Sequence, residues 1–155
     1  LRAMLALTSL VWAWMRLLEP DTQNVELASA IAAVCEVGKP LHRGDVFGER
    51  CAATLTAIAF RESGFHHGKV GDHGRSKCEF QIQDAPGVET NRLLCATVAK
   101  ARVRESMAIC QKGNELCLYA AGPRGLDVAR EKTEAITRDR FALAKWLMTH
   151  RGESK

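Results

Sequence analysis

The stretch Ala57-Ile-Ala-Phe-Arg-Glu-Ser-Gly-Phe65 ends an apolar helix, and Gly71-Asp-His-Gly-Arg-Ser-Lys-Cys-Glu-Phe-Gln-Ile82 follows it as a glycine-rich polar loop. Helical spacing of i, i+3, i+4 and i+7 places Glu62 on the buried face of this helix, together with Leu55, Ile58 and Ala59. A carboxyl group on that face is partly desolvated, which favours its neutral form. We therefore expect Glu62 to donate a proton at the edge of a groove. The alternative is an ion pair between Glu62 and a neighbouring arginine at the helix end.

Two further segments extend this pattern along the chain. The polar loop contains Ser76-Lys-Cys-Glu-Phe-Gln81-Ile82, and the segment Leu118-Tyr119-Ala-Ala-Gly122-Pro123 lies downstream of it. With Glu62-Ser63 and the nearby Phe65, these motifs resemble those of the lysozyme-like superfamily, most closely lytic transglycosylases and goose-type lysozymes. The resemblance covers residues 50–125. It implies a mainly α, lysozyme-like helical domain with a long irregular active-site loop that has room for a little β structure.

Two residues depart from the pattern of that superfamily. Cys78 stands where the family usually has glycine, a residue that serves positions of positive φ or close backbone approach. We expect an altered loop there or a disulfide tether. Ala120 replaces an asparagine, so an amide that could bind sugar or the catalytic carboxyl group is missing. Both changes predict reduced activity or a changed specificity.

The resemblance implies cleavage of the β-1,4 bond between N-acetylmuramic acid and N-acetylglucosamine in peptidoglycan. A lytic transglycosylase uses one carboxyl group, here Glu62, as acid and then base, while the 6-hydroxyl of muramic acid attacks and leaves a 1,6-anhydro product. A goose-type lysozyme hydrolyses the bond instead, and Asp72 is the residue that could position a water. The other reading of Asp72 is an aspartate that caps a turn. Chitin-like glycans also contain N-acetylglucosamine and are further candidate substrates, but their cleavage would need a second carboxylate or a participating acetamide group.

Four more residues are candidates for substrate binding. Gln81 can hydrogen-bond a sugar acetamido or hydroxyl group, and Tyr119, the chain's only tyrosine, can donate its hydroxyl to Glu62 or to substrate. Ser63 and Ser76 could orient the carboxyl group or bind the N-acetyl group, although a serine at a helix terminus often only satisfies backbone groups. Glu79 is left out as a second acid because its place in the loop motif varies in the family.

Two rival functions come from other classes. The departures at Cys78 and Ala120 are compatible with a non-catalytic peptidoglycan-binding or assembly protein, against which the intact Glu62 argues. A disulfide-stapled helical protein could instead bind a protein partner through the apolar residues 1–18. Truncating that helix discriminates, since loss of partner binding alone would favour the second rival and unfolding would identify the helix as core.

Length and charge restrict the remaining possibilities. A chain of 155 residues with 46% hydrophobic content supports one domain, residues 1–155, and we expect a monomer. A net charge of +4 with scattered basic residues and few aromatics suits an acidic glycan and does not indicate nucleic acid. No cofactor is expected. Cysteine and histidine spacing does not match a zinc module, so no metal is expected either.

Six cysteines are many for a cytosolic chain of this size, and they predict an oxidising compartment, periplasmic or secreted. Cys110 and Cys117 bracket the turn at Gly113-Asn114, which makes a local disulfide plausible, and Cys35 with Cys51 is a second candidate pair. The sequence does not choose among the 15 pairings that six cysteines allow.

The remaining pattern is helical. Residues 1–18 form a strongly apolar helix that ends before Pro20; we favour a packed core helix over a remnant of an export signal or anchor, so membrane contact is not the preferred reading. Asp21-Thr22 offers an N-cap for the next helix. Residues 64–88 lack helical periodicity and hold several glycines, so any β structure should lie there. The predicted helices span 1–18, 22–37, 49–62, 89–112, 114–121 and 125–149.

Overall fold

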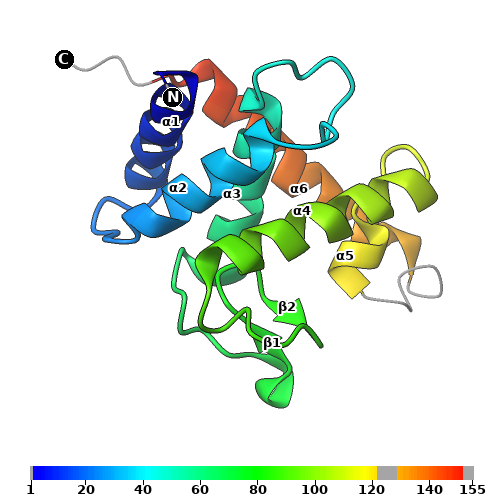
Figure 1. Cartoon of the computed structure of the whole chain (residues 1–155). Helices are drawn as coiled ribbons and strands as arrows, with labels where there is room; N and C mark the ends of the chain where they lie inside the picture. Colours follow the sequence, from blue (N-terminus) through cyan, green and yellow to red (C-terminus); the bar gives the residue numbers. More distant parts are fainter. Residues whose placement is uncertain (1, 122–128, 152–155) are drawn as a thin grey trace.

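The computed structural model describes residues 2–121 and 129–151, and within them the chain is mainly helical, as predicted (Figure 1). The carboxyl end of the third motif, Gly122-Pro123, and the predicted helix residues 125–128 lie outside the described residues. The elements in chain order are α1 (Arg2–Leu18), α2 (Val25–Glu36), α3 (Glu49–Ser63), the 3-10 turn η1 (Asp72–Gly74), β1 (Ser76–Lys77), β2 (Ile82–Gln83), α4 (Arg92–Ile109), α5 (Cys117–Ala121) and α6 (Arg130–Thr149).

Helix α3 is the centre of the core. It packs against α1, α2, α4 and α6, and small residues allow those helices to approach closely. Its middle section is buried without interruption from Cys51 to Ala59. Because α3 is fixed on so many sides, the side chains at its carboxyl end are held at a defined place in the fold.

Helix α1 belongs to this core, as the packed-helix interpretation predicted. Leu7, Val11, Trp14 and Met15 are buried, and the Trp14 indole Nε1 donates a hydrogen bond of 2.9 Å to the carbonyl of His150. Figure 1 shows the two ends of the fold meeting here, with α1 beside the last turn of α6. Among the described residues, no helix combines the length and the apolar character that a membrane span requires.

The start of α2 differs from the prediction. Asn24, rather than Asp21-Thr22, is the N-cap, because its Oδ1 accepts a hydrogen bond of 3.2 Å from the backbone N–H of Leu27. Asp21 and Thr22 lie in the turn that follows Pro20. Asn24 takes this position because its amide group makes two kinds of contact. Its oxygen caps the helix, and its nitrogen donates to Phe65 and Glu79 in the loop between α3 and α4.

The predicted irregular segment after α3 is present, and its regular structure is one short antiparallel pair with Ser76 opposite Gln83 and Lys77 opposite Ile82. Each residue here with positive φ other than glycine costs conformational energy. Within the described part of the chain all such residues lie in this loop: Phe65, Asp72, His73, Cys78, Gln81 and Asp84. Contacts from the surrounding helices must therefore hold the loop in place.

Three disulfide bonds tie the chain locally: Cys35–Cys51, Cys78–Cys95 and Cys110–Cys117. The two pairs proposed from the sequence are confirmed. Cys78 has φ of 59°, so it occupies the backbone region that favours glycine and also carries the tether to α4. The Cys35–Cys51 and Cys78–Cys95 disulfides close loops of 16 and 17 residues, and each bond is expected to add about 3 kcal/mol to the free energy of unfolding. This disulfide content fits an oxidising compartment.

Stability should fall between pH 6.5 and pH 4 because of one buried histidine. Burial, reinforced by the charge of Arg50, lowers the pKa of His42 from 6.5 to about 4. The unfolded chain therefore binds this proton first, so the free energy of unfolding drops as the pH falls, by roughly 3 kcal/mol in this window. Urea unfolding at pH 7 and pH 4 measures the drop.

His42→Gln is the matching variant, because its amide can still donate to Thr54 Oγ1, which His42 Nε2 contacts at 2.8 Å. The variant should lose most of the pH dependence in that range. An unchanged slope in His42→Gln would assign the acid sensitivity to other groups.

Candidate functional site

A cavity of about 410 Å³ opens at the carboxyl end of α3. The loop after α3 forms one wall, and α4, α5 and α6 contribute the others. Five of the six residues predicted as a site meet here, although they come from three separate motifs. The polar and charged lining consists of Glu62, Asp72, Ser76, Gln81, Gln83, Arg102, Tyr119 and Arg140, and Phe80, Ile82, Leu118, Ala120 and Ile136 complete it.

Glu62 is held at the last turn of α3 by charge as well as by packing. Its Oε1 lies 3.4 Å from Nη2 of Arg140 on α6, and its side chain is 27% exposed. The backbone carbonyl of Glu62 accepts a hydrogen bond of 2.8 Å from Lys69 Nζ, which satisfies one of the free carbonyls at the helix end. The ion pair that the sequence left as an alternative is therefore present, but the arginine comes from a distant helix.

Arg140 connects this carboxylate to a second one. Its Nη1 donates to Asp139 Oδ2 at 2.7 Å, and Arg61 on α3 contacts the same oxygen at 3.1 Å. Arg140 Nε is buried and has no hydrogen-bond partner within the described residues. Arg140 therefore contacts Glu62 through Nη2 and Asp139 through Nη1.

Asp72 lies on η1 at the open side of the cavity. Its Oδ2 accepts hydrogen bonds from Ser76 Oγ and, at 2.8 Å, from Gln83 Nε2. These two hydrogen bonds lower the pKa of the Asp72 carboxyl group, because they stabilise its charged form. Asp72 is therefore an ionised, exposed carboxylate in the same cavity as Glu62.

Tyr119 reaches the cavity from α5, but its hydroxyl donates neither to Glu62 nor into the cavity, the two alternatives that the sequence left open. It donates to the carbonyl of Phe80 at 2.7 Å and so ties α5 to the loop. Burial, followed by the negative charge of Glu62, raises the pKa of Tyr119 well above its ordinary value. The hydroxyl therefore keeps its proton, which it donates to the Phe80 carbonyl.

Two other predicted binding residues have structural hydrogen bonds. Gln81 lines the cavity, yet its Nε2 donates to the carbonyls of Lys69 and Cys78, both at 2.9 Å. Ser63 does not line the cavity. It is buried, and its Oγ donates to the carbonyl of Ala59 at 3.0 Å, as a serine in the last turn of a helix commonly does.

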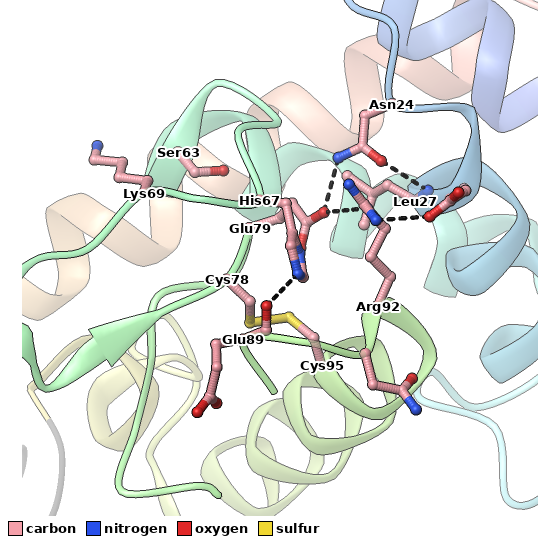
Figure 2. Close-up of polar contacts among 12 residues, drawn as sticks. Asn24, Leu27, Ser63, His67, Lys69, Cys78, Glu79, Glu89, Arg92 and Cys95 are labelled. Atoms are coloured by element: carbon pink, nitrogen blue, oxygen red, sulfur yellow. Dashed lines mark hydrogen bonds and ion pairs between the residues drawn. A yellow bond between two sulfur atoms is a disulfide. The ribbon is translucent and has the colours of Figure 1, made fainter. Parts of the chain in front are cut away.

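A buried carboxylate on the other face of the loop holds this wall in position (Figure 2). Glu79 is fully buried, and its Oε1 accepts from Asn24 Nδ2 at 2.7 Å and from Arg92 Nε at 3.1 Å. His67 Nδ1 lies 2.7 Å from Glu79 Oε2, while its Nε2 contacts the carbonyl of Glu89 at 2.6 Å. Glu79 therefore joins α2, the loop and α4.

The disulfide between Cys78 and Cys95 also fixes the loop at this point. Cys78 and Cys95 lie beside Glu79, and their disulfide runs from the loop to α4 in Figure 2. Both sulfurs are committed to that bond, so the group offers no thiolate to a metal ion. Glu79 is not among the residues that line the cavity.

Arg102, like Arg140, is a cationic residue of the cavity that the sequence motifs did not indicate. It is half-buried on α4, and no carboxylate within the described residues forms an ion pair with it. Its charge, like that of Arg140, opposes the rise in the pKa of Tyr119. Arg102 and Arg140 were missed because they lie on helices with no local motif; only the packing of α4 and α6 against α3 brings them here.

No family model, curated protein or solved structure matches this chain.

Proposed function

We propose that this protein cleaves peptidoglycan glycan strands between N-acetylmuramic acid and N-acetylglucosamine, with Glu62 as general acid and base. The observation that carries the proposal is the convergence of Glu62, Asp72, Ser76, Gln81 and Tyr119 on one cavity. These residues come from α3, the following loop and α5, and the fold brings them to one cavity. A periplasmic or secreted location, in keeping with the disulfides, is part of the proposal.

The reaction that the site suits best is a non-hydrolytic transglycosylation. Glu62 donates its proton to the glycosidic oxygen as the bond from that oxygen to the anomeric carbon breaks. The 6-hydroxyl of the same muramic acid then attacks the anomeric carbon and returns a proton to Glu62. One carboxyl group suffices, no water is consumed, and the product is a 1,6-anhydro sugar.

The ion pair with Arg140 imposes one condition on this cycle. A protonated Glu62 loses the charge that attracts the guanidinium group, so the contact at 3.4 Å must loosen when Glu62 acts as an acid. The hydrogen bond from Arg140 Nη1 to Asp139 at 2.7 Å does not involve Glu62, so it can hold the guanidinium group in place during that step.

Hydrolysis is the second candidate, and the geometry of Asp72 favours it over the remaining alternatives. Its carboxylate is exposed in the same cavity, and the hydrogen bonds from Ser76 and Gln83 keep its pKa low. An ionised carboxylate on the open side of a cavity can orient and activate a water. In that case the protein would act as a lysozyme with Glu62 as acid and Asp72 as base.

Mass spectrometry of fragments released from purified peptidoglycan tests both forms of the proposal. Anhydro-muramic ends would support transglycosylation, and reducing ends that disappear in Asp72→Asn would support hydrolysis. A folded wild-type protein that releases no fragments but sediments with peptidoglycan would contradict catalysis and favour a non-catalytic binding or assembly protein.

A further inference from the structure

Two guanidinium groups line the cavity around Glu62, those of Arg102 and Arg140, and they differ in whether they form ion pairs. Arg140 is already committed, through Asp139 at 2.7 Å and Glu62 at 3.4 Å. Asp72, the remaining acid of the cavity, takes its short hydrogen bonds from the neutral groups of Ser76 and Gln83. Arg102 is thus the cavity cation with no carboxylate partner in the described part of the chain.

Arg102 is only partly buried on the cavity wall, so its guanidinium group keeps part of its water shell, and no carboxylate in the described part of the chain offsets the part that it loses. Partial burial removes water from the guanidinium group, and a paired carboxylate normally compensates for this loss. An incoming anion can supply that compensation through charge-assisted, bidentate hydrogen bonds, for which the planar guanidinium fork is suited. The position of Arg102 on the wall of the cavity therefore points to an anionic group on the ligand.

We infer that Arg102 binds a carboxylate of the substrate and makes the site selective for acidic, muramic acid-containing glycans over neutral chitin-like ones. The inference rests on the proposed function, because it names the feature that this site recognises. Chitin-like glycans carry no ionised group. A peptidoglycan strand offers two sources of carboxylate close to the scissile bond: the lactyl group of muramic acid where the stem peptide is absent, and the stem peptide itself where it is present.

Binding to three defined ligands tests the inference. Glu62→Gln protein is titrated calorimetrically with chitohexaose, with soluble strands stripped of their stem peptides, and with soluble strands that keep them. Adding Arg102→Gln should weaken binding to at least one carboxylate-bearing strand by about tenfold or more and leave chitohexaose within about twofold. The strand that loses affinity identifies the lactyl group or the stem peptide as the source.

Two variants on α4 serve as controls. Arg104→Gln removes an exposed arginine two residues away, which faces a different side of the helix, and should leave all three affinities unchanged. Arg102→Lys keeps the charge but loses the fork, so its affinity for the sensitive strand should lie between those of wild type and Arg102→Gln. Thermal unfolding of each variant checks that the fold is retained.

The outcomes separate this inference from the proposed function. Equal weakening for all three ligands, or none for any, would overturn the role of Arg102 even if wild-type protein releases anhydro fragments. Selective weakening in a protein that releases no fragments would keep the role of Arg102 and overturn catalysis. If neither type of strand binds more tightly than chitohexaose, the inference is wrong whatever the activity.

Discussion

Replacing Glu62 by glutamine should reduce the release of peptidoglycan fragments by about 10² to 10⁴-fold, the usual contribution of a positioned general acid. The amide has nearly the same shape as the carboxyl group but cannot deliver a proton to the glycosidic oxygen. Stability should fall by about 1 to 2 kcal/mol, because the amide keeps the shape of the side chain but gives up a partly buried ion pair, with Glu62 27% exposed and 3.4 Å from Arg140. Fragment release by mass spectrometry, together with urea unfolding, measures both quantities.

Glu105→Gln is the control for the loss of a carboxylate. Glu105 is exposed on α4 and lies outside the cavity, so its substitution should leave both fragment release and stability close to wild type. If Glu62→Gln releases fragments at the wild-type rate, the proton comes from another group and the proposed mechanism fails. If Glu62→Gln instead unfolds, the ion pair with Arg140 is a structural element and the loss of activity carries no mechanistic meaning.

Glu79→Gln should lower the free energy of unfolding by about 3 to 5 kcal/mol, the range found when one partner of a buried ion pair is removed. The carboxylate is fully buried, and three side chains from different parts of the chain converge on it. Removing its charge leaves Arg92 and His67 facing a neutral amide whose nitrogen is a donor, as theirs are. Urea denaturation at pH 7 measures the change.

Glu26→Gln is the matched control because Glu26 binds the same Arg92, at 2.6 Å, from an exposed position. Its loss should cost less than about 1 kcal/mol. The contrast tests burial directly, since both variants remove one carboxylate from one guanidinium group. Similar, small losses in the two variants would show that the loop is held by its disulfide and by Tyr119 rather than by the charge of Glu79.

The helical fold was predictable because its signal is local. Apolar residues at helical spacing, with Pro20 and the glycines of residues 64–88 as interruptions, place the helices of the described regions to within a few residues. Two of the three disulfides were also predicted: Cys110–Cys117 because a turn lies between its cysteines, and Cys35–Cys51 because its cysteines follow one another along the chain. The third, Cys78–Cys95, has a similar separation but joins the irregular loop to α4, and the sequence does not show how that loop folds. The N-cap of α2 was predicted wrongly, because Asn24 is held there by a hydrogen bond to Glu79, which lies far from it in the sequence.

The candidate site was predictable only in part, for a related reason. Motifs identify residues of the loop and of the ends of α3 and α5, and five of the six residues chosen in this way share the cavity. The motifs do not give hydrogen-bond partners: the donors of Tyr119, Gln81 and Ser63 are used by backbone carbonyls. Arg102 and Arg140 depend on helix packing, which no single segment of sequence specifies.

The disulfide order has a consequence for how the protein matures. The cysteines pair in their order along the chain, the first with the second, the third with the fourth and the fifth with the sixth, at separations of 16, 17 and 7 residues. A chain that enters an oxidising compartment amino end first would therefore expose both members of one pair before any member of the next. Oxidation in order of arrival gives the native connectivity out of the 15 combinations that six cysteines allow. Such a chain would reach its native disulfides while it is being translocated, with few wrong pairs for an isomerase to correct.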